Sequence, residues 1–298
     1  MVLCETSLLP DSLMGIWLLY SLAGVAIVMG LAVPLFIKYY VNPTYEMWRW
    51  KTNPKFPSAD MVKVEIIKSV KGAFLATFAP ALSTYLSRSN SEYTRGYCGL
   101  DEKHDLFYTA KMFFFTWIIS DFYEFFYHWL GHTYDALWEQ HKSHHRFYNP
   151  TPFATIADDV VDQIFRSLPL LLIPVLFEVN IDVLFAQWGT LFYVYGTYLH
   201  WGYESQYISA HNKILNTAYD HHCHHAKSIK NKAIRTGFFF KIWDNLFGSI
   251  YKEPCFCVRC QHQLGKRTLE EFKSVTLPDY SILLKPSFWM TSVDEKKL

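Results

Sequence analysis

The stretch that decides the fold is residues 106–145, LFYTAKMFFFTWIISDFYEFFYHWLGHTYDALWEQHKSHH. It starts as an apolar run rich in aromatic side chains and ends in a cluster of histidines. An apolar segment of about 20 residues can cross a bilayer, and histidines four residues apart share one face of a helix. The stretch therefore predicts a membrane helix, ending near residue 127, with histidines beyond its end.

Three further apolar segments extend this pattern. The first, residues 13–37, carries no charged side chain over 25 residues, which is too long for the core of a signal peptide. The second, residues 72–87, is short, and the last, residues 167–203, has the pattern of an apolar hairpin whose first arm is bent by Pro169 and Pro174. The chain is thus predicted to be all-α, an integral membrane helical bundle of about four spans.

The charges on either side of the first apolar segment predict its orientation. Glu5 and Asp11 precede the segment, whereas four basic residues follow it: Lys38, Arg49, Lys51 and Lys55. Because basic residues favour the cytosolic side, the N-terminus is expected in the lumen. Counting spans from there places all the histidine clusters at the cytosolic face, in a helical cap. Residues 252–298, which are polar, are expected to form a cytosolic tail.

Composition excludes several classes of function. The net charge of +1 provides no broad positive field for binding nucleic acid. Six cysteines in 298 residues do not make a small disulfide scaffold. The chain has no Rossmann-type glycine fingerprint and no haem or flavin motif, so any redox reaction requires electrons from a partner.

Histidines carry the clearest chemical signal. Thirteen are present, and most fall into three short clusters: His128 and His132; His141, His144 and His145; and His221, His224 and His225. Neighbouring histidines point about 100° apart on a helix and can therefore reach different ions. These eight imidazoles are too many for one ion and predict a centre with two metals, to which His200 is a further candidate ligand.

Other polar residues near the clusters are assigned lesser roles. Asp121 and Glu124 lie seven and four residues before His128 and are expected to accept the second ring N–H of a ligand histidine. His222 is the extra member of its cluster and is also expected to act from outside the metal ligands. For His104, His211 and His262, a surface or hydrogen-bonding role is expected. Imidazole alone suits iron, zinc and copper, so the ligands do not name the metal.

The spacing of these histidines resembles that of the fatty acid hydroxylase / sterol desaturase superfamily. Asp121 and the segment GFFFKIWDNLFGS at residues 237–249 also match, and the likeness covers residues 106–251. Within the superfamily, NPTPFA at residues 149–154 is most similar to sterol C5-desaturases (lathosterol oxidases). Two features depart from that group: Trp129 stands where arginine is usual, and LHWGYE at residues 199–204 is closer to C4-methyl sterol oxidases.

The resemblance implies two iron ions that activate O2, a sterol substrate, residence in the endoplasmic reticulum membrane, and cytochrome b5 or an equivalent electron donor. It also implies a division into a membrane anchor region (residues 1–105), a catalytic domain (residues 106–251) and the tail. A C4-methyl sterol oxidase or fatty acyl hydroxylase is the alternative, and a non-catalytic metal-binding membrane protein is a distant one. Five basic residues near the clusters are candidates for docking the donor: Lys142, Lys227, Lys230, Lys232 and Arg235.

Two smaller features lead to weaker predictions. The hairpin is expected to supply the apolar wall of a sterol slot, from Leu170, Leu171, Leu172, Val175, Leu176, Phe177, Phe192, Tyr193 and Tyr195. Cys255, Cys257, Cys260 and His262 together suggest a zinc site, but so tight a run of ligands does not easily surround a tetrahedral ion. Reduced thiols with packing roles are therefore favoured, and the function of these cysteines is left open.

Overall fold

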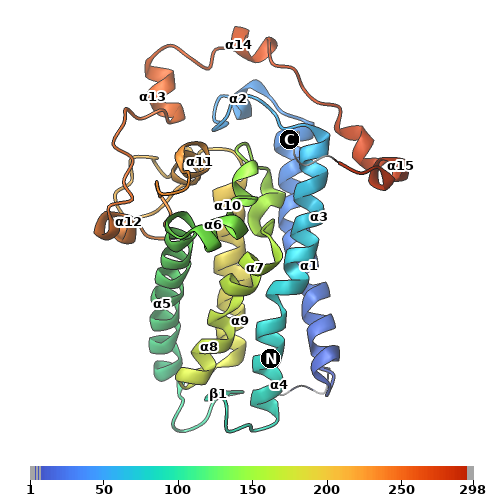
Figure 1. Ribbon diagram of the computed structural model, residues 1–298, viewed down its shortest axis with the longest axis vertical. Helices are drawn as coiled ribbons and strands as arrows, with labels where there is room; N and C mark the ends of the chain where they lie inside the picture. Colours follow the sequence, from blue (N-terminus) through green and yellow to red (C-terminus); the bar gives the residue numbers. More distant parts are fainter. Residues whose placement is uncertain (1–3, 5, 7, 294–298) are drawn as a thin grey trace.

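The structure is a computed structural model that describes residues 4, 6 and 8–293 and is mostly helical (Figure 1). Long helices run side by side along the molecule, and shorter helices gather over one end. The strands found among the described residues are β1 (Gly96–Tyr97) and β2 (Val179–Asn180), which pair in parallel at the opposite end. The all-α prediction is confirmed.

The bundle consists of helical columns, and each column is either one helix or several consecutive helices that follow one another in line. Their bounds are α1 (Leu13–Phe36) continued by η1 (Ile37–Val41); α3 (Ala59–Ala76) and α4 (Phe78–Arg88); α5 (Leu106–Thr133); α7 (Val160–Ser167) and α8 (Pro169–Leu176); and α9 (Ile181–Gln187), η4 (Trp188–Phe192) and α10 (Tyr193–His200). Both α3 and α4 pack on α1, and α5 packs on the hairpin made by α8 and α9.

Local sequence explains where the columns begin and bend. Asp105 caps α5 by accepting the N–H of Tyr108 at 2.7 Å. Ser58 caps α3 in the same way, so the second column starts at Ala59 rather than at residue 72 as predicted, and it breaks at Thr77. Pro169 opens α8 directly after α7 ends, which is the bend expected in the hairpin.

The membrane prediction is met only in part. In the described part of the chain, one helix, Leu13–Val41, is long and apolar enough to cross a membrane. The other predicted spans do form helices, but charged and tyrosine side chains lower the hydropathy of α5, and the hairpin is divided into short helices. The number of spans therefore stays a proposal. Glu5, one of the two acidic residues before the first apolar segment, lies outside the described residues, as do the first residues of the predicted anchor region and the last residues of the predicted tail.

The cap over one end is built of short elements. These are α2 (Tyr45–Trp48), α6 (Asp135–His141), η2 (His144–Arg146), η3 (Pro152–Ile156), α11 (Ala218–Lys227) and α12 (Ile242–Phe247), followed by the tail elements α13 (Val258–Gln263), α14 (Leu269–Lys273), η5 (Tyr280–Leu284) and α15 (Pro286–Met290). The tail arches over the cap to α3, where Lys63 Nζ donates to Phe288 O at 2.5 Å (Figure 1).

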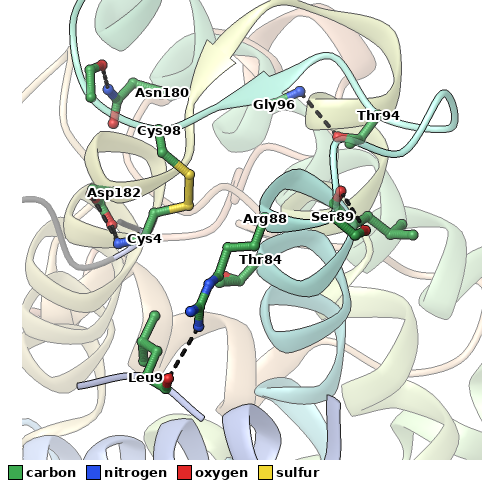
Figure 2. The surroundings of a disulfide bond; sticks show 12 residues. Cys4, Leu9, Thr84, Arg88, Ser89, Thr94, Gly96, Cys98, Asn180 and Asp182 are labelled. Carbon is green, nitrogen blue, oxygen red and sulfur yellow. Dashed lines mark hydrogen bonds between the residues drawn. A yellow bond between two sulfur atoms is a disulfide. The ribbon is translucent and has the colours of Figure 1, made fainter. Parts of the chain in front are cut away.

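At the other end of the bundle a disulfide joins Cys4 to Cys98, which are 94 residues apart in the sequence (Figure 2). Cys4 N–H also donates to Asp182 Oδ1 at 3.0 Å, and Arg88 donates to Leu9 O at 3.2 Å. The segment before α1 is thereby fastened to α4, to the loop after it and to α9. The remaining cysteines, Cys223, Cys255, Cys257 and Cys260, are free thiols in the cap and tail.

Candidate metal centre

The histidines form two adjacent groups under the cap. One contains His128, His132, His141, His145 and His224, and the other contains His144, His200, His221 and His225. Within each group, one ring nitrogen from every member lies within 4.8 Å of the others. All nine predicted ligands are therefore brought together. The structure also separates His144 from His145, and His224 from His225, as their spacing predicts.

Four segments deliver these side chains. His128 and His132 project from the last turns of α5, and His200 ends α10. The last cluster lies on α11, whose first turn is fixed by a capping box in which Thr217 and Asp220 bond each other's backbone. The middle cluster departs from the expected continuous helix, because α6 ends at His141 and the next two histidines lie in the 3₁₀ turn η2.

Polar contacts at Nδ1 orient six of the rings. Carbonyl oxygens accept from four of them: Thr236 O from His128, Ile229 O from His132, Gly196 O from His200 and Ile234 O from His224, at 2.7–3.2 Å. A carboxylate oxygen lies 3.0 Å from Nδ1 of the other two, Asp162 beside His141 and Asp158 beside His144. With the proton on Nδ1, Nε2 keeps a lone pair directed into the group.

The distances between Nε2 atoms fit ligands that share an ion. In the first group His145 Nε2 lies 3.0 Å from that of His132 and 3.1 Å from those of His141 and His224. In the second, His221 Nε2 lies 2.8 Å from that of His200 and 3.0 Å from that of His225. Two nitrogens bound at ~2.1 Å to one ion stand about 3.0 Å apart at a right angle and about 3.4 Å apart at a tetrahedral angle.

Uncharged rings are needed for such a site, and burial supplies them. Burial first, and then the neighbouring histidines, lower the pKa values of His145, His221, His224 and His225 well below the ordinary value. In addition, His128 Nε2 is buried without a hydrogen-bond partner. Converging lone pairs on neutral buried rings repel one another unless a cation lies between them. The donor set fits iron, and equally other ions that accept imidazole.

Two carboxylates that the sequence did not single out support these rings. Asp162 and Asp158 are both buried, and Asp158 Oδ2 also accepts from Arg166 Nη1 at 3.0 Å. Burial alone would raise the pKa of Asp158, but the Arg166 guanidinium and the His144 ring outweigh it and hold that pKa below its usual range. In the sequence, these two carboxylates could have been noticed as acidic residues four positions apart, just before the apolar hairpin.

The roles expected for Asp121 and Glu124 are wrong. Asp121 accepts the backbone N–H of Phe239 and the indole N–H of Trp243, both at 2.7 Å. Glu124 pairs with Arg166 at 3.0 Å. These two carboxylates are one to two turns up the helix from His128, where they face other segments. Asp121 therefore holds the segment at residues 237–249 to α5, and Glu124 reaches the histidines only through Arg166 and Asp158.

The other histidines divide in three ways. His222 is buried but belongs to neither converging histidine group, and its ring packs on Phe256. His104 and His262 have hydrogen-bonding roles, as expected: His104 bonds Asp101 and Glu178, and His262 bonds Arg49 O. His211 differs from the expectation, because it lies among the three tail cysteines.

An apolar cavity lies between α1, the α3–α4 column and the hairpin. Its volume is about 210 Å³, and its lining includes Ile27, Leu170 and Trp188. A smaller cavity of about 50 Å³ shares Leu170 and Trp188 with it and extends to Glu124 and Arg166.

Only some of the side chains predicted for the sterol wall line these cavities, and the wall itself stays a prediction. Leu170, Phe192 and Tyr193 line these cavities. Leu172, Val175 and Leu176 are instead exposed on the outer surface of the hairpin, and Tyr195 donates to Asn216 O at 2.5 Å. Leu171 and Phe177 pack against the cluster of buried residues around Ile173.

The sequence of this chain resembles those of known proteins. The model of the fatty acid hydroxylase family matches residues 113–249. The chain is 33% identical over 135 residues to a Delta(7)-sterol 5(6)-desaturase of Eremothecium gossypii, covering 45% of this chain and 34% of that protein. It is 32% identical over 171 residues to one of Candida dubliniensis (57% and 39% covered), and 25% identical over 205 residues to Delta(7)-sterol 5(6)-desaturase ERG3A of Gibberella zeae (68% and 54%).

The matched part of the chain thus spans about a third to a half of these relatives' length. No solved structure matches the chain significantly. The matched segment contains all nine of the converging histidines. Residues 113–249 therefore match the fatty acid hydroxylase family, and the chain is similar to Delta(7)-sterol 5(6)-desaturases.

Proposed function

We propose that this protein is a membrane-bound di-iron oxidoreductase that introduces the C5 double bond into a Δ7-sterol. The observation that carries the proposal is the pair of adjacent histidine groups, each with neutral Nε2 atoms at the spacing of ligands around one ion. Nine imidazoles exceed what a single hydrolytic zinc ion requires. Overall, the sterol would lose two hydrogens while O2, two electrons and two protons become two molecules of water.

Two iron ions bound there would supply O2 activation and the removal of hydrogen from an unactivated C–H bond. The protein's own part is to hold the rings and exclude water. Carbonyl oxygens from the segments after α11 fix three of the rings, those of His128, His132 and His224. Asp158 and Asp162 keep the protons of His144 and His141 on Nδ1, which leaves Nε2 free to bind metal.

The apolar cavity supports a lipid substrate. It lies between Ile27 on α1 and Trp188 on the hairpin, and its smaller extension ends at Arg166, whose guanidinium pairs with Asp158 beside His144. A lipid that enters between the two helices would therefore approach the metal centre from the bilayer. The wall is apolar, so it selects substrates chiefly by shape. The sterol assignment rests on the named relatives, which are Delta(7)-sterol 5(6)-desaturases.

We further propose that the protein is a multi-pass membrane protein of the endoplasmic reticulum with the metal centre facing the cytosol. Large apolar side chains are exposed along the bundle: Met14, Leu18, Leu22 and Ile27 on α1, Phe107, Phe114 and Ile118 on α5, and Leu172, Leu176 and Val194 on the hairpin. The disulfide lies at the end away from the histidines, and all the free thiols lie at the other end. Disulfides persist in the oxidising lumen and thiols in the reducing cytosol.

Cytochrome b5, or an equivalent carrier, is proposed as the electron donor. The structure weakens the suggested basic docking surface, because three of its five residues pair with acids of this chain. Lys142 pairs with Glu139, Lys230 with Asp135 at 2.9 Å, and Arg235 with Asp220 at 3.6 Å. The affinity for the donor is therefore expected to fall less steeply with salt concentration than it would if all five cations were unpaired.

The decisive experiment supplies the purified protein, an electron donor and O2 with a Δ7-sterol, a 4-methylsterol and a fatty acyl lipid in parallel. Formation of the 5,7-diene from the first supports the proposal. Oxidation of the 4-methyl group or the acyl chain, with the Δ7-sterol untouched, would move the protein to the alternative hydroxylase function. No O2 consumption with any lipid, despite two bound irons, would favour a protein that only binds metal.

A further inference from the structure

The tail cysteines form a compact group with a histidine from a distant loop. His211 Nε2 lies 3.3 Å from Cys255 Sγ, 3.6 Å from Cys257 Sγ and 3.5 Å from Cys260 Sγ. All four atoms lie within 4.8 Å of one another. His211 precedes α11, whereas the cysteines surround the start of α13, so 44 residues separate the histidine from the first thiol.

These distances match a tetrahedral ion. A ring nitrogen at ~2.05 Å and a thiolate sulfur at ~2.3 Å from one zinc ion stand about 3.6 Å apart at the tetrahedral angle. Hydrogen bonding does not explain the arrangement as well, since a single Nε2 cannot satisfy three sulfur atoms at once. We propose that His211, Cys255, Cys257 and Cys260 bind a structural zinc ion, independently of the histidine centre.

The backbone shows how so short a run of cysteines can surround an ion. Cys255 lies in the irregular segment before α13, Cys257 is the N-cap residue of that helix, and Cys260 lies in its first turn. The chain direction therefore changes between the first and second thiols and again between the second and third. The Cys257 N–H donates to Cys255 Sγ at 3.4 Å, a bond that suits a thiolate. His211 closes the fourth side from the outside, where it is exposed.

Four protein ligands leave no open position, so the site is structural rather than catalytic. Its place in the fold indicates what it would stabilise. Next to the thiols, Val258 N–H donates to Glu204 Oε1 at 2.7 Å and Arg259 donates to Gln206 O at 2.7 Å. The ion would thus join the start of the tail to the loop between α10 and α11, the two helices that carry His200 and His221.

The test uses the full chain purified in detergent and does not depend on catalysis. Metal analysis should give zinc in addition to the histidine-bound metal, and zinc X-ray absorption should show three sulfur neighbours at ~2.3 Å and one nitrogen. The histidine groups contain no sulfur donor, so sulfur around zinc reports this site alone. His211→Ala and Cys257→Ser should each lose the sulfur-bound zinc and make the tail more sensitive to protease. Both variants should keep the metal at the histidine centre.

Matched controls are Cys223→Ser and His262→Ala, which alter a nearby free thiol and the other histidine of this segment. Both should retain sulfur-bound zinc. If Cys257→Ser fails to fold, the wild-type protein still decides the matter: a thiol-specific mercurial should release zinc as it titrates the tail cysteines. Zinc bound only by nitrogen, a disulfide among the three thiols, sulfur-bound iron with visible absorption, or sulfur-bound zinc persisting in His211→Ala would each overturn the proposal.

Discussion

The Asp162 carboxylate offers the sharpest test of how the metal centre is held. Its Oδ2 atom lies 3.0 Å from His141 Nδ1, and the side chain is completely buried. Asp162→Asn keeps an oxygen that can accept the same N–H but removes the negative charge. The His141 ring should then be a weaker ligand, although its position is nearly unchanged.

The size of the effect follows from the kind of hydrogen bond that is lost. Hydrogen bonds to charged groups contribute about 1.5–3 kcal/mol and neutral ones about 0.5–1.5 kcal/mol. The difference of about 1–1.5 kcal/mol corresponds to a roughly tenfold weaker metal affinity. Asp162→Ala removes the acceptor entirely and should reach the upper part of the ~10–100-fold range typical of such partners.

Asp121→Asn provides the matched control. Asp121 is an equally buried carboxylate, but it binds Phe239 N–H and Trp243 Nε1–H instead of a histidine. The assay is retention of Fe(II) against a competing chelator, with thermal unfolding measured alongside. Asp162→Asn should lower iron retention, whereas Asp121→Asn should lower the unfolding temperature and leave iron affinity unchanged. Equal iron affinity in Asp162→Asn and wild type would refute the assigned role of this carboxylate.

Three further predictions address the cavity, the ligands and the topology. Gly189 lines the apolar cavity, and a Cβ added there would meet only Ile27 Cδ1, at 4.0 Å, so the Gly189→Leu side chain should fill the cavity. Sterol turnover should then fall while the metal content stays intact. Gly30→Leu is the control, because a Cβ at Gly30 meets nothing within 4 Å, and this variant should keep its turnover. His221→Ala should lose metal and His222→Ala should retain it, because only His221 belongs to a converging group; equal metal content in the two variants would contradict the grouping. A glycosylation sequence inserted at residues 99–103, beside the disulfide, should be glycosylated in microsomes. The same sequence inserted at residues 252–254 should not be glycosylated. The reverse pattern would mean that the proposed orientation is inverted.

Local patterns allowed the convergence of these histidines to be predicted. His128 and His132 needed only a helix, and the separation of His224 from His225 follows from the angle between neighbouring residues on α11. Even where the chain leaves the helix, at η2, His144 and His145 still point to different groups. Short-range spacing is enough here because a turn of either helix type directs successive side chains apart.

Partners from distant segments could not be predicted in this way. Asp121 fits the position expected of an acceptor on the helix of His128, yet tertiary packing brings Phe239 and Trp243 to it and brings Asp162 to His141. The same limitation applies to His211, which has no meaningful spacing from the tail cysteines until the fold places it beside them. Contacts of this kind depend on how separate segments pack, and that information is not contained in any single stretch of sequence.

The Cys4–Cys98 disulfide has a consequence for biosynthesis. It closes a covalent ring that contains α1, α3 and α4, so the first half of the bundle is circular once the bond has formed. Under the proposed topology both sulfur atoms reach an oxidising compartment only after α1 and the α3–α4 column have been inserted in the correct direction. A chain inserted the wrong way round would keep both thiols reduced. The bond would therefore form only in chains whose first half has been inserted correctly.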